Sequence, residues 1–307
     1  MPTSRRTDGV LLAVAVVWGS SYLTAKAATE ALPVLIVLFL RYALGALACL
    51  PALRGSRALT RDERTYGVLL GLTQAAVLVL ETYGVAHTSA GNAGLIISLT
   101  LVLTPVLDRA VLPGRFFLAA GACVAGVGLL VSGHGLRAPG AGDLLMLAAA
   151  VVRAGHVVLL GRVTARRALR PFQLTAVQSV VGAVLFLVPA APGLPLLART
   201  GAATWAQLLH LALFCGLFAF LAQTWAVQRT SPTRAGLLLG TEPVWALLTG
   251  VALGGDRLTA LSLLGAALIV GGTYWGQAVE RAHRALRPKM TRDAAPREVG
   301  TGFPQAS

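Results

Sequence analysis

The sequence has little charge. Only 12% of its 307 residues are charged, whereas 56% are hydrophobic. A soluble domain carries about 25% charged residues, so this chain has about half of the charge that a water-exposed surface needs. The shortage argues against a soluble enzyme and against a disordered chain. We therefore predict a protein that crosses a membrane many times.

Cysteine is also scarce. Cys49, Cys123 and Cys215 lie far apart in apolar runs, in an odd number and without the spacing of metal ligands. This pattern argues against a disulfide scaffold, redox chemistry or a metal site. The sequence contains no phosphate-binding G-x-x-x-x-G-K-[ST] loop, no H-E-x-x-H pair and no nucleophile elbow. We therefore expect no enzyme, no cofactor and no ATP hydrolysis within this chain.

Acidic residues are few: 12 Asp and Glu stand against 26 Lys and Arg, which gives a net charge of +14. Such an excess can indicate nucleic-acid binding, but a groove-reading surface needs a soluble module. The basic residues lie instead in short clusters between apolar segments and in the C-terminal tail. Membrane topology explains this distribution better, and we expect no nucleic-acid partner.

Long apolar segments, by contrast, are abundant. A membrane-spanning helix needs about 20 mostly apolar residues, because the hydrocarbon core is about 30 Å thick. Ten stretches meet this requirement: 9–27, 33–52, 67–87, 91–111, 116–133, 143–161, 172–190, 205–228, 234–254 and 258–279. With the N-terminus inside, 20 Lys and Arg fall on the cytoplasmic side and 4 on the other side. This asymmetry predicts a multi-pass protein of the plasma (cytoplasmic) membrane with both termini in the cytoplasm.

The chain repeats itself. Residues 81–95 (ETYGVAHTSAGNAGL) and 223–237 (QTWAVQRTSPTRAGL) are identical at seven of fifteen positions. Each unit holds five predicted spans, and because five is odd the second unit must enter the membrane inverted. Inverted repeats are typical of secondary transporters, in which two similar halves meet around a site near the midplane. Duplication of a unit of helices also occurs in channels and in purely structural helix bundles, so these are alternatives to a transporter.

Four segments carry a family resemblance: WGSSYLTAKAA at 18–28, FLRYALGAL at 39–47, HTSAGNAGLIISLTLVLTPVLD at 87–108, and the run from 229 to 272. They resemble the EamA-type transporters of the drug/metabolite transporter (DMT) superfamily. The first half departs from the pattern, because Thr100-Leu101 stands where the second half has Glu242-Pro243. The resemblance implies ten helices in two inverted five-helix repeats around a central cavity, and movement of small metabolites without ATP.

The fold class expected is therefore an all-α polytopic membrane protein. Its expected parts are a cytoplasmic N-terminus (1–8), a first five-helix repeat (9–133), a connecting loop (134–142), a second repeat (143–279), and a basic, then disordered cytoplasmic tail (280–307).

Four charged residues lie away from the ends of the predicted spans, where each costs at least about 2.5–3.5 kcal/mol on insertion scales. They are Arg41, Glu81, Arg153 and Glu242. Glu242 precedes a proline, and it could bind a cationic group or a coupling proton, or serve as the structural partner of either arginine. For Arg41 structural pairing is favoured, whereas Arg153 is the preferred residue for an anionic group of a substrate. Glu81 is a second candidate for proton coupling.

The remaining candidates are polar or aromatic. His156 lies three residues after Arg153, so the two side chains share one helix face. His156 could act as a proton relay, or it could be a hydrogen-bonded histidine of the interior. Glu81 and Gln223 occupy equivalent places in the two repeats, which favours a role in lining the cavity. The other candidates could line a cavity or join helices: Trp18, Gln74, Asn92 and Gln178.

These observations predict a secondary active transporter that moves a small polar or amphipathic metabolite, amino-acid-like or drug-like, by alternating access. Proton-coupled efflux is the expected direction, by resemblance alone. The expected partners are a small-molecule substrate, the lipid bilayer and protons; the sequence predicts no oligomeric state. The alternatives are a facilitator or exchanger of the same fold, a membrane-embedded enzyme, and a scaffold that transports nothing.

Overall fold

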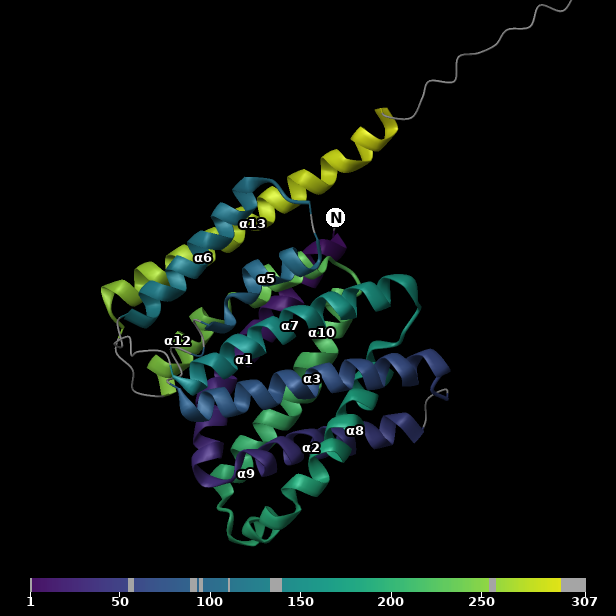
Figure 1. Ribbon diagram of the computed structural model, residues 1–307, viewed down its shortest axis with the longest axis vertical. Helices are drawn as coiled ribbons and strands as arrows, with labels where there is room; N and C mark the ends of the chain where they lie inside the picture. The colour runs from purple at the N-terminus through teal and green to yellow at the C-terminus, as the bar shows by residue number, and fades with distance from the viewer. Residues whose placement is uncertain are drawn as a thin grey trace, which may run out of the picture.

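The computed structural model describes residues 2–54, 58–88, 93, 96–109, 111–132, 140–253 and 258–293. Every regular element in this part of the chain is helical, and long apolar helices lie side by side in a bundle (Figure 1). This agrees with the all-α prediction.

The helices follow one another with short connections. The first half contains α1 (Pro2–Ala31), α2 (Val34–Arg54), α3 (Arg61–His87), α5 (Thr100–Leu107) and α6 (Gly114–Ser132). The second half contains α7 (Ala141–Arg166), α8 (Pro171–Ala190), the 3₁₀ turn η1 (Ala191–Arg199), α9 (Ala202–Leu209), the π-helical segment η2 (His210–Phe218), α10 (Ala219–Val227), α11 (Pro232–Leu239), α12 (Glu242–Leu253) and α13 (Ala260–Asp293).

Six helical stretches are long and apolar enough to cross a bilayer. They are Arg5–Ala31, Arg61–His87, Ala141–Arg166, Pro171–Arg199, Ala202–Val227 and Pro232–Leu253, and two shorter apolar helices cover Val34–Leu50 and Gly114–Leu129. The chain is therefore an integral membrane protein with several spans. The predicted span 91–111 is only partly described and contains α5, and the predicted span 258–279 continues as helix through Asp293.

Local sequence signals explain where several helices begin. α3 starts with a capping box, in which the Glu63 backbone N–H donates to Thr60 Oγ1 (3.1 Å) and the Thr60 N–H donates to Glu63 Oε2 (3.0 Å). α8 starts at Pro171 and α11 at Pro232, positions where a missing N–H costs no hydrogen bond. A capping box and two prolines thus mark where these three helices begin.

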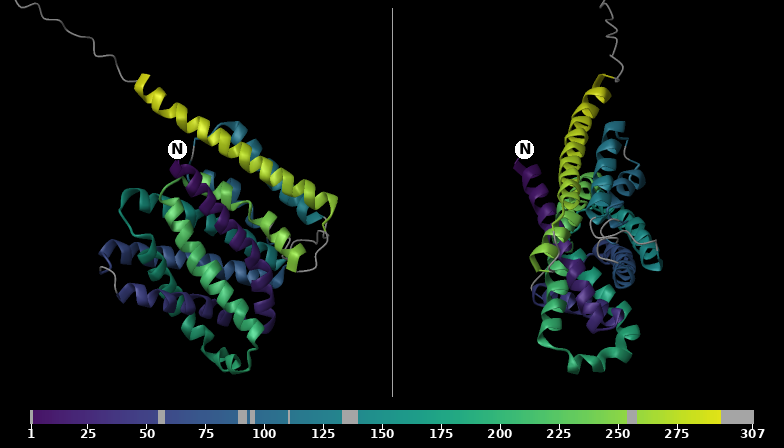
Figure 2. Two further views of the ribbon diagram at one scale, coloured as in Figure 1. Left: turned by 180° about the vertical axis from the view of Figure 1, so that it is seen from behind. Right: turned by 90° about the vertical axis from the view of Figure 1, so that its left-hand side faces the viewer.

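The two halves interlock at the centre of the bundle. α1 packs against α10, α11 and α12 of the second half, and α3 packs against α7 and α8. α6 and α13 lie together along one edge (Figure 1). Seen from the other sides, α1 runs beside α10 across the back of the bundle (Figure 2). Residues from both halves therefore meet around the axis of the bundle, where α1, α3, α7 and α12 come together.

Two glycines allow this close approach. A Cβ atom on Gly19 of α1 would lie 2.6 Å from Trp245 Cβ of α12, and one on Gly240 would collide with the Leu101 side chain of α5. Small residues at such positions let membrane helices pack backbone to backbone.

Candidate functional site

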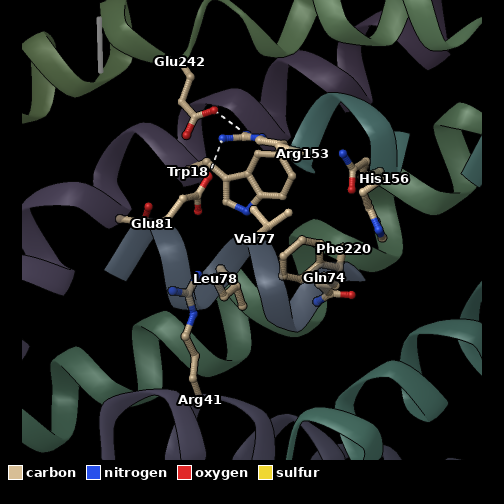
Figure 3. A pocket seen from close by; sticks show the side chains of 12 residues that line it. Trp18, Arg41, Gln74, Val77, Leu78, Glu81, Arg153, His156, Phe220 and Glu242 are labelled. Carbon is tan, nitrogen blue, oxygen red and sulfur yellow. Dashed lines mark hydrogen bonds and ion pairs between the residues drawn. The ribbon is translucent and has the colours of Figure 1, made fainter. Parts of the chain in front are cut away.

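A buried cluster of three charges lies where the halves meet. The Arg153 guanidinium on α7 donates from Nη1 to Glu81 Oε1 on α3 (3.1 Å) and from Nη2 to Glu242 Oε2 on α12 (2.6 Å) (Figure 3). The exposed fractions of these side chains are 11% for Arg153, 17% for Glu81 and 5% for Glu242. One arginine thus joins a carboxylate of the first half to a carboxylate of the second half.

A break in the ninth predicted span positions Glu242. The sequence predicted one span over 234–254, but the structure divides it into α11, which ends at Leu239, and α12, which begins at Glu242. Pro243 has no N–H with which to continue the hydrogen bonds of α11, and this accounts for the break. Glu242 consequently occupies the N-terminus of α12, where the helix dipole stabilises a carboxylate. Its second oxygen, Oε1, accepts a hydrogen bond from the Tyr22 hydroxyl (2.8 Å).

The indole of Trp18 covers the third side of Arg153. The guanidinium carbon lies 4.5 Å from the centroid of the Trp18 ring, which is within the range of a cation–π interaction. Trp18 is itself held in place, because its Nε1–H donates to the carbonyl of Cys215 in the π-helical segment η2 (3.0 Å). Two carboxylates and one ring therefore surround Arg153.

These residues surround one central cavity. It is lined by Trp18, Ser21, Arg41, Gln74, Val77, Leu78, Glu81, Arg153, His156, Phe220, Gln223 and Glu242 (Figure 3). The space left is small: about 30 Å³ can be reached by the centre of a water-sized sphere. A water needs about 10–15 Å³ by this measure, so the cavity has room for two or three waters.

Arg41 enters the same cavity from α2, and no carboxylate of the described residues pairs with it. Arg41 is 7% exposed, and its Nε atom is buried without a hydrogen bond to any described residue. The Oε1 atom of neighbouring Gln74 is likewise unpartnered in this part of the chain. A smaller hollow continues beyond Arg41, between Gln74, Tyr42 and Ser179. Since an unpaired buried charge costs several kcal/mol, Arg41 is a site where a bound anionic group would be stabilised.

The structure brings most of the predicted residues together. Eight of them line the central cavity: Trp18, Arg41, Gln74, Glu81, Arg153, His156, Gln223 and Glu242. Gln178 lies outside its lining, buried on α8 with both amide atoms unpartnered among the described residues. Asn92 lies outside the described residues. His156, which lines the cavity, is also hydrogen-bonded through Nδ1 to Thr73 Oγ1 (2.8 Å).

Sequence reasoning assigned no hydrogen-bonding role to Tyr22. Tyr22 lies four residues after Trp18 on α1, so the two side chains share a helix face, and this spacing was the available signal. Ser21, Val77, Leu78 and Phe220 also line the cavity, but as small or apolar residues in apolar spans they carried no distinguishing pattern.

Comparison with known proteins gives concordant matches. Residues 6–132 and 140–275 match the EamA-like transporter family. An "Uncharacterized transporter" of Archaeoglobus fulgidus is 27% identical over 263 residues, which cover 85% of this chain and 82% of the relative. The "Uncharacterized inner membrane transporter YedA" of Escherichia coli (strain K12) is 25% identical over 272 residues, which cover 85% of this chain and 87% of that protein.

A solved crystal structure shares the fold. It matches with a TM-score of 0.71 at 18% sequence identity, over 89% of this chain and 97% of the other. The named relatives are transporters, which argues against an enzyme and supports a membrane transporter with a small-molecule substrate. Both halves match one family and together make up most of the sequence. The chain therefore belongs to the EamA-like transporter family.

Proposed function

We propose that this protein is a secondary active transporter that moves a small polar or amphipathic metabolite by alternating access. In this proposal ten spans form two inverted five-helix repeats, with both termini in the cytoplasm. The observation that carries the proposal is the Glu81–Arg153–Glu242 cluster, which links α3 of the first half to α7 and α12 of the second. A site held jointly by two repeats is what alternating access requires.

The cost of these charges supports transport over a passive scaffold. Burying ionisable groups in a membrane protein is expensive, and such groups usually mark substrate or ion pathways. A scaffold would be more stable with apolar residues at the same positions.

Glu81 is the residue that we assign to proton coupling. Both oxygens of Glu242 are engaged, by Arg153 and by Tyr22. Glu81 is hydrogen-bonded only through Oε1 among the described residues, and its side chain is more exposed to the cavity. A proton on Glu81 would remove the negative charge that a cationic group of the substrate needs. Proton and substrate would then exclude each other, as proton-driven efflux requires.

Arg41 is the residue that we assign to an anionic group of the substrate. The sequence favoured Arg153 for this role, but two carboxylates already occupy the Arg153 donors. Arg41 faces the same cavity with an unpartnered Nε atom, and no carboxylate among the described residues competes for it.

Reconstituted transport tests the proposal. Proteoliposomes containing the protein would be assayed for uptake and efflux of a metabolite panel, with and without an imposed pH gradient. We expect saturable flux of at least one compound, accelerated by the gradient. Glu81→Gln should lose the acceleration by the gradient and should also weaken binding of a compound with a cationic group, because glutamine carries no negative charge.

The possible results separate the candidates. Flux that ignores the gradient in the unmodified protein would replace the proton-coupled transporter with a facilitator or exchanger. Gradient-driven flux that survives Glu81→Gln unchanged would remove Glu81 from coupling. Absence of flux for every compound, with the protein correctly folded and inserted, would count against transport.

A further inference from the structure

A groove on the outer face of the bundle lies between α1 and α10. Its walls are apolar, formed by Val10 and Ala13 of α1, and by Phe218, Leu221, Ala222 and Trp225. Its volume, measured as for the central cavity, is about 250 Å³, and Arg6 lines one end. α1 and α10 are in contact along this face (Figure 2). The groove is separate from the central cavity, with which it shares no lining residue.

Two guanidinium groups lie close to the indole of Trp225, which lines this groove. The Arg6 guanidinium carbon lies 5.8 Å from the centroid of the Trp225 ring, and that of Arg229 lies 4.3 Å from the same centroid. Arg229 also donates from Nη1 to the Trp225 carbonyl (2.8 Å). Arg6 and Arg229 are both exposed, and Arg5 is an exposed neighbour. The positive-inside distribution places these residues at the cytoplasmic face.

Other arginines at this face have carboxylate partners. Arg234 pairs with Asp8 (2.5 Å), and Arg170 pairs with Glu63 (2.7 Å). Arg6 and Arg229 pair with no carboxylate of the described residues, although Asp8 is close to Arg6 in sequence. Two like charges beside one indole repel each other, so an anion bound near both guanidinium groups would stabilise the arrangement.

We propose that this groove, with Arg6 and Arg229, is a binding site for an anionic phospholipid of the cytoplasmic leaflet. The phosphate group would lie between the two guanidinium groups, and an acyl chain would lie along Phe218 and Leu221. Basic pockets at the cytoplasmic ends of membrane helices have the charge that acidic headgroups require, and tryptophan is a common residue at that depth. The site lies outside the substrate cavity and does not depend on the transport cycle.

Lipid binding to the purified full-length protein tests the proposal directly. In neutral detergent, phosphatidylglycerol and phosphatidylcholine with the same acyl chains would be titrated while the thermal unfolding midpoint is followed. We expect phosphatidylglycerol to bind on the order of tenfold more tightly, because each basic residue near a membrane surface contributes about 1 kcal/mol towards acidic lipid. The double variant Arg6→Gln/Arg229→Gln should lose this preference.

Matched variants keep the test decisive. Arg61→Gln/Arg64→Gln removes two exposed arginines at the start of α3, away from the groove, and should retain the preference. The variant Arg6→Lys/Arg229→Lys keeps both charges and should retain most of the preference for phosphatidylglycerol. It provides a second test if the Gln double variant does not fold. Equal binding of both lipids, or an equal loss in both Gln double variants, would overturn the proposal.

Fluorescence locates the acyl chain. Phosphatidylglycerol with brominated acyl chains quenches nearby tryptophan, and the signal of Trp225 is obtained by subtracting a Trp225→Phe variant. We expect quenching of Trp225 by brominated phosphatidylglycerol at concentrations about tenfold lower than by brominated phosphatidylcholine. Quenching at the same concentrations of both lipids would show a groove that takes acyl chains without selecting the headgroup, which contradicts the proposal.

Discussion

The protein places two arginines in the interior of the membrane and treats them in opposite ways. Arg153 is held by two carboxylates and an indole ring, whereas Arg41, across the same cavity, has no carboxylate partner among the described residues. The partners of Arg153 hold its charge in place and join α3, α7 and α12. The charge of Arg41 has no such partner among the described residues and is available to a ligand. Because both side chains are buried, burial alone does not distinguish them; their hydrogen bonds do, and on that difference we base the proposed structural role of Arg153 and the proposed binding role of Arg41.

Removing Arg153 should have the largest effect on stability. Arg153→Gln leaves Glu81 and Glu242 buried without a countercharge, and we expect the free energy of unfolding to fall by about 3–5 kcal/mol. Unfolding of the purified protein in mixed micelles measures this change. A loss below about 1 kcal/mol would mean that the cluster does not hold the halves together.

A smaller effect is expected from the hydroxyl of Tyr22. Tyr22→Phe removes the hydrogen bond to Glu242 and should lower the free energy of unfolding by about 1.5–3 kcal/mol, the usual range for a bond to a charged group. Tyr42→Phe is the matched control, since the Tyr42 hydroxyl is buried without a partner in the described part of the chain. Equal losses in the two variants would contradict the role given to the Tyr22–Glu242 bond.

The smallest change in stability is expected at Arg41. Arg41→Gln removes an uncompensated charge, so the free energy of unfolding should change by less than about 1 kcal/mol or rise. Transport should respond instead, with the half-saturation concentration rising about tenfold or more because a charged hydrogen bond to substrate is lost. Arg41→Lys should recover part of this loss. A large fall in stability with an unchanged half-saturation concentration would assign Arg41 a structural role.

Much of the helical architecture follows from composition. Apolar runs of about 20 residues can only be buried in a bilayer as helices, so the positions of α2, α3, α7 and α8 could be predicted from hydropathy. The break before Glu242 was harder to predict from the sequence, because a proline in a membrane helix can either kink the helix or end it. The extension of α13 past residue 279 had no apolar signal at all, since its sequence there is basic.

The sequence predicted which residues belong to the candidate site, but it did not predict which arginine pairs with which carboxylate. Charged and amide residues inside apolar spans are costly, so Arg41, Glu81, Arg153 and Glu242 stood out from the sequence alone. Which arginine meets which acid depends on how α2 and α7 are rotated about their axes, and small packing contacts decide that rotation. Tyr22 illustrates the same limit, because a tyrosine in a span is ordinary until its hydroxyl is seen to meet a carboxylate.

The small volume of the central cavity has a consequence for the proposed transport cycle. A space for two or three waters is smaller than a metabolite, so under the proposed mechanism we expect a compound to bind only after the helices separate. We then expect the rate of association to be limited by opening rather than by diffusion, and to level off as the compound becomes more concentrated. We also expect the affinity measured at equilibrium to be lower than that of the open form, in proportion to the fraction of molecules that are open.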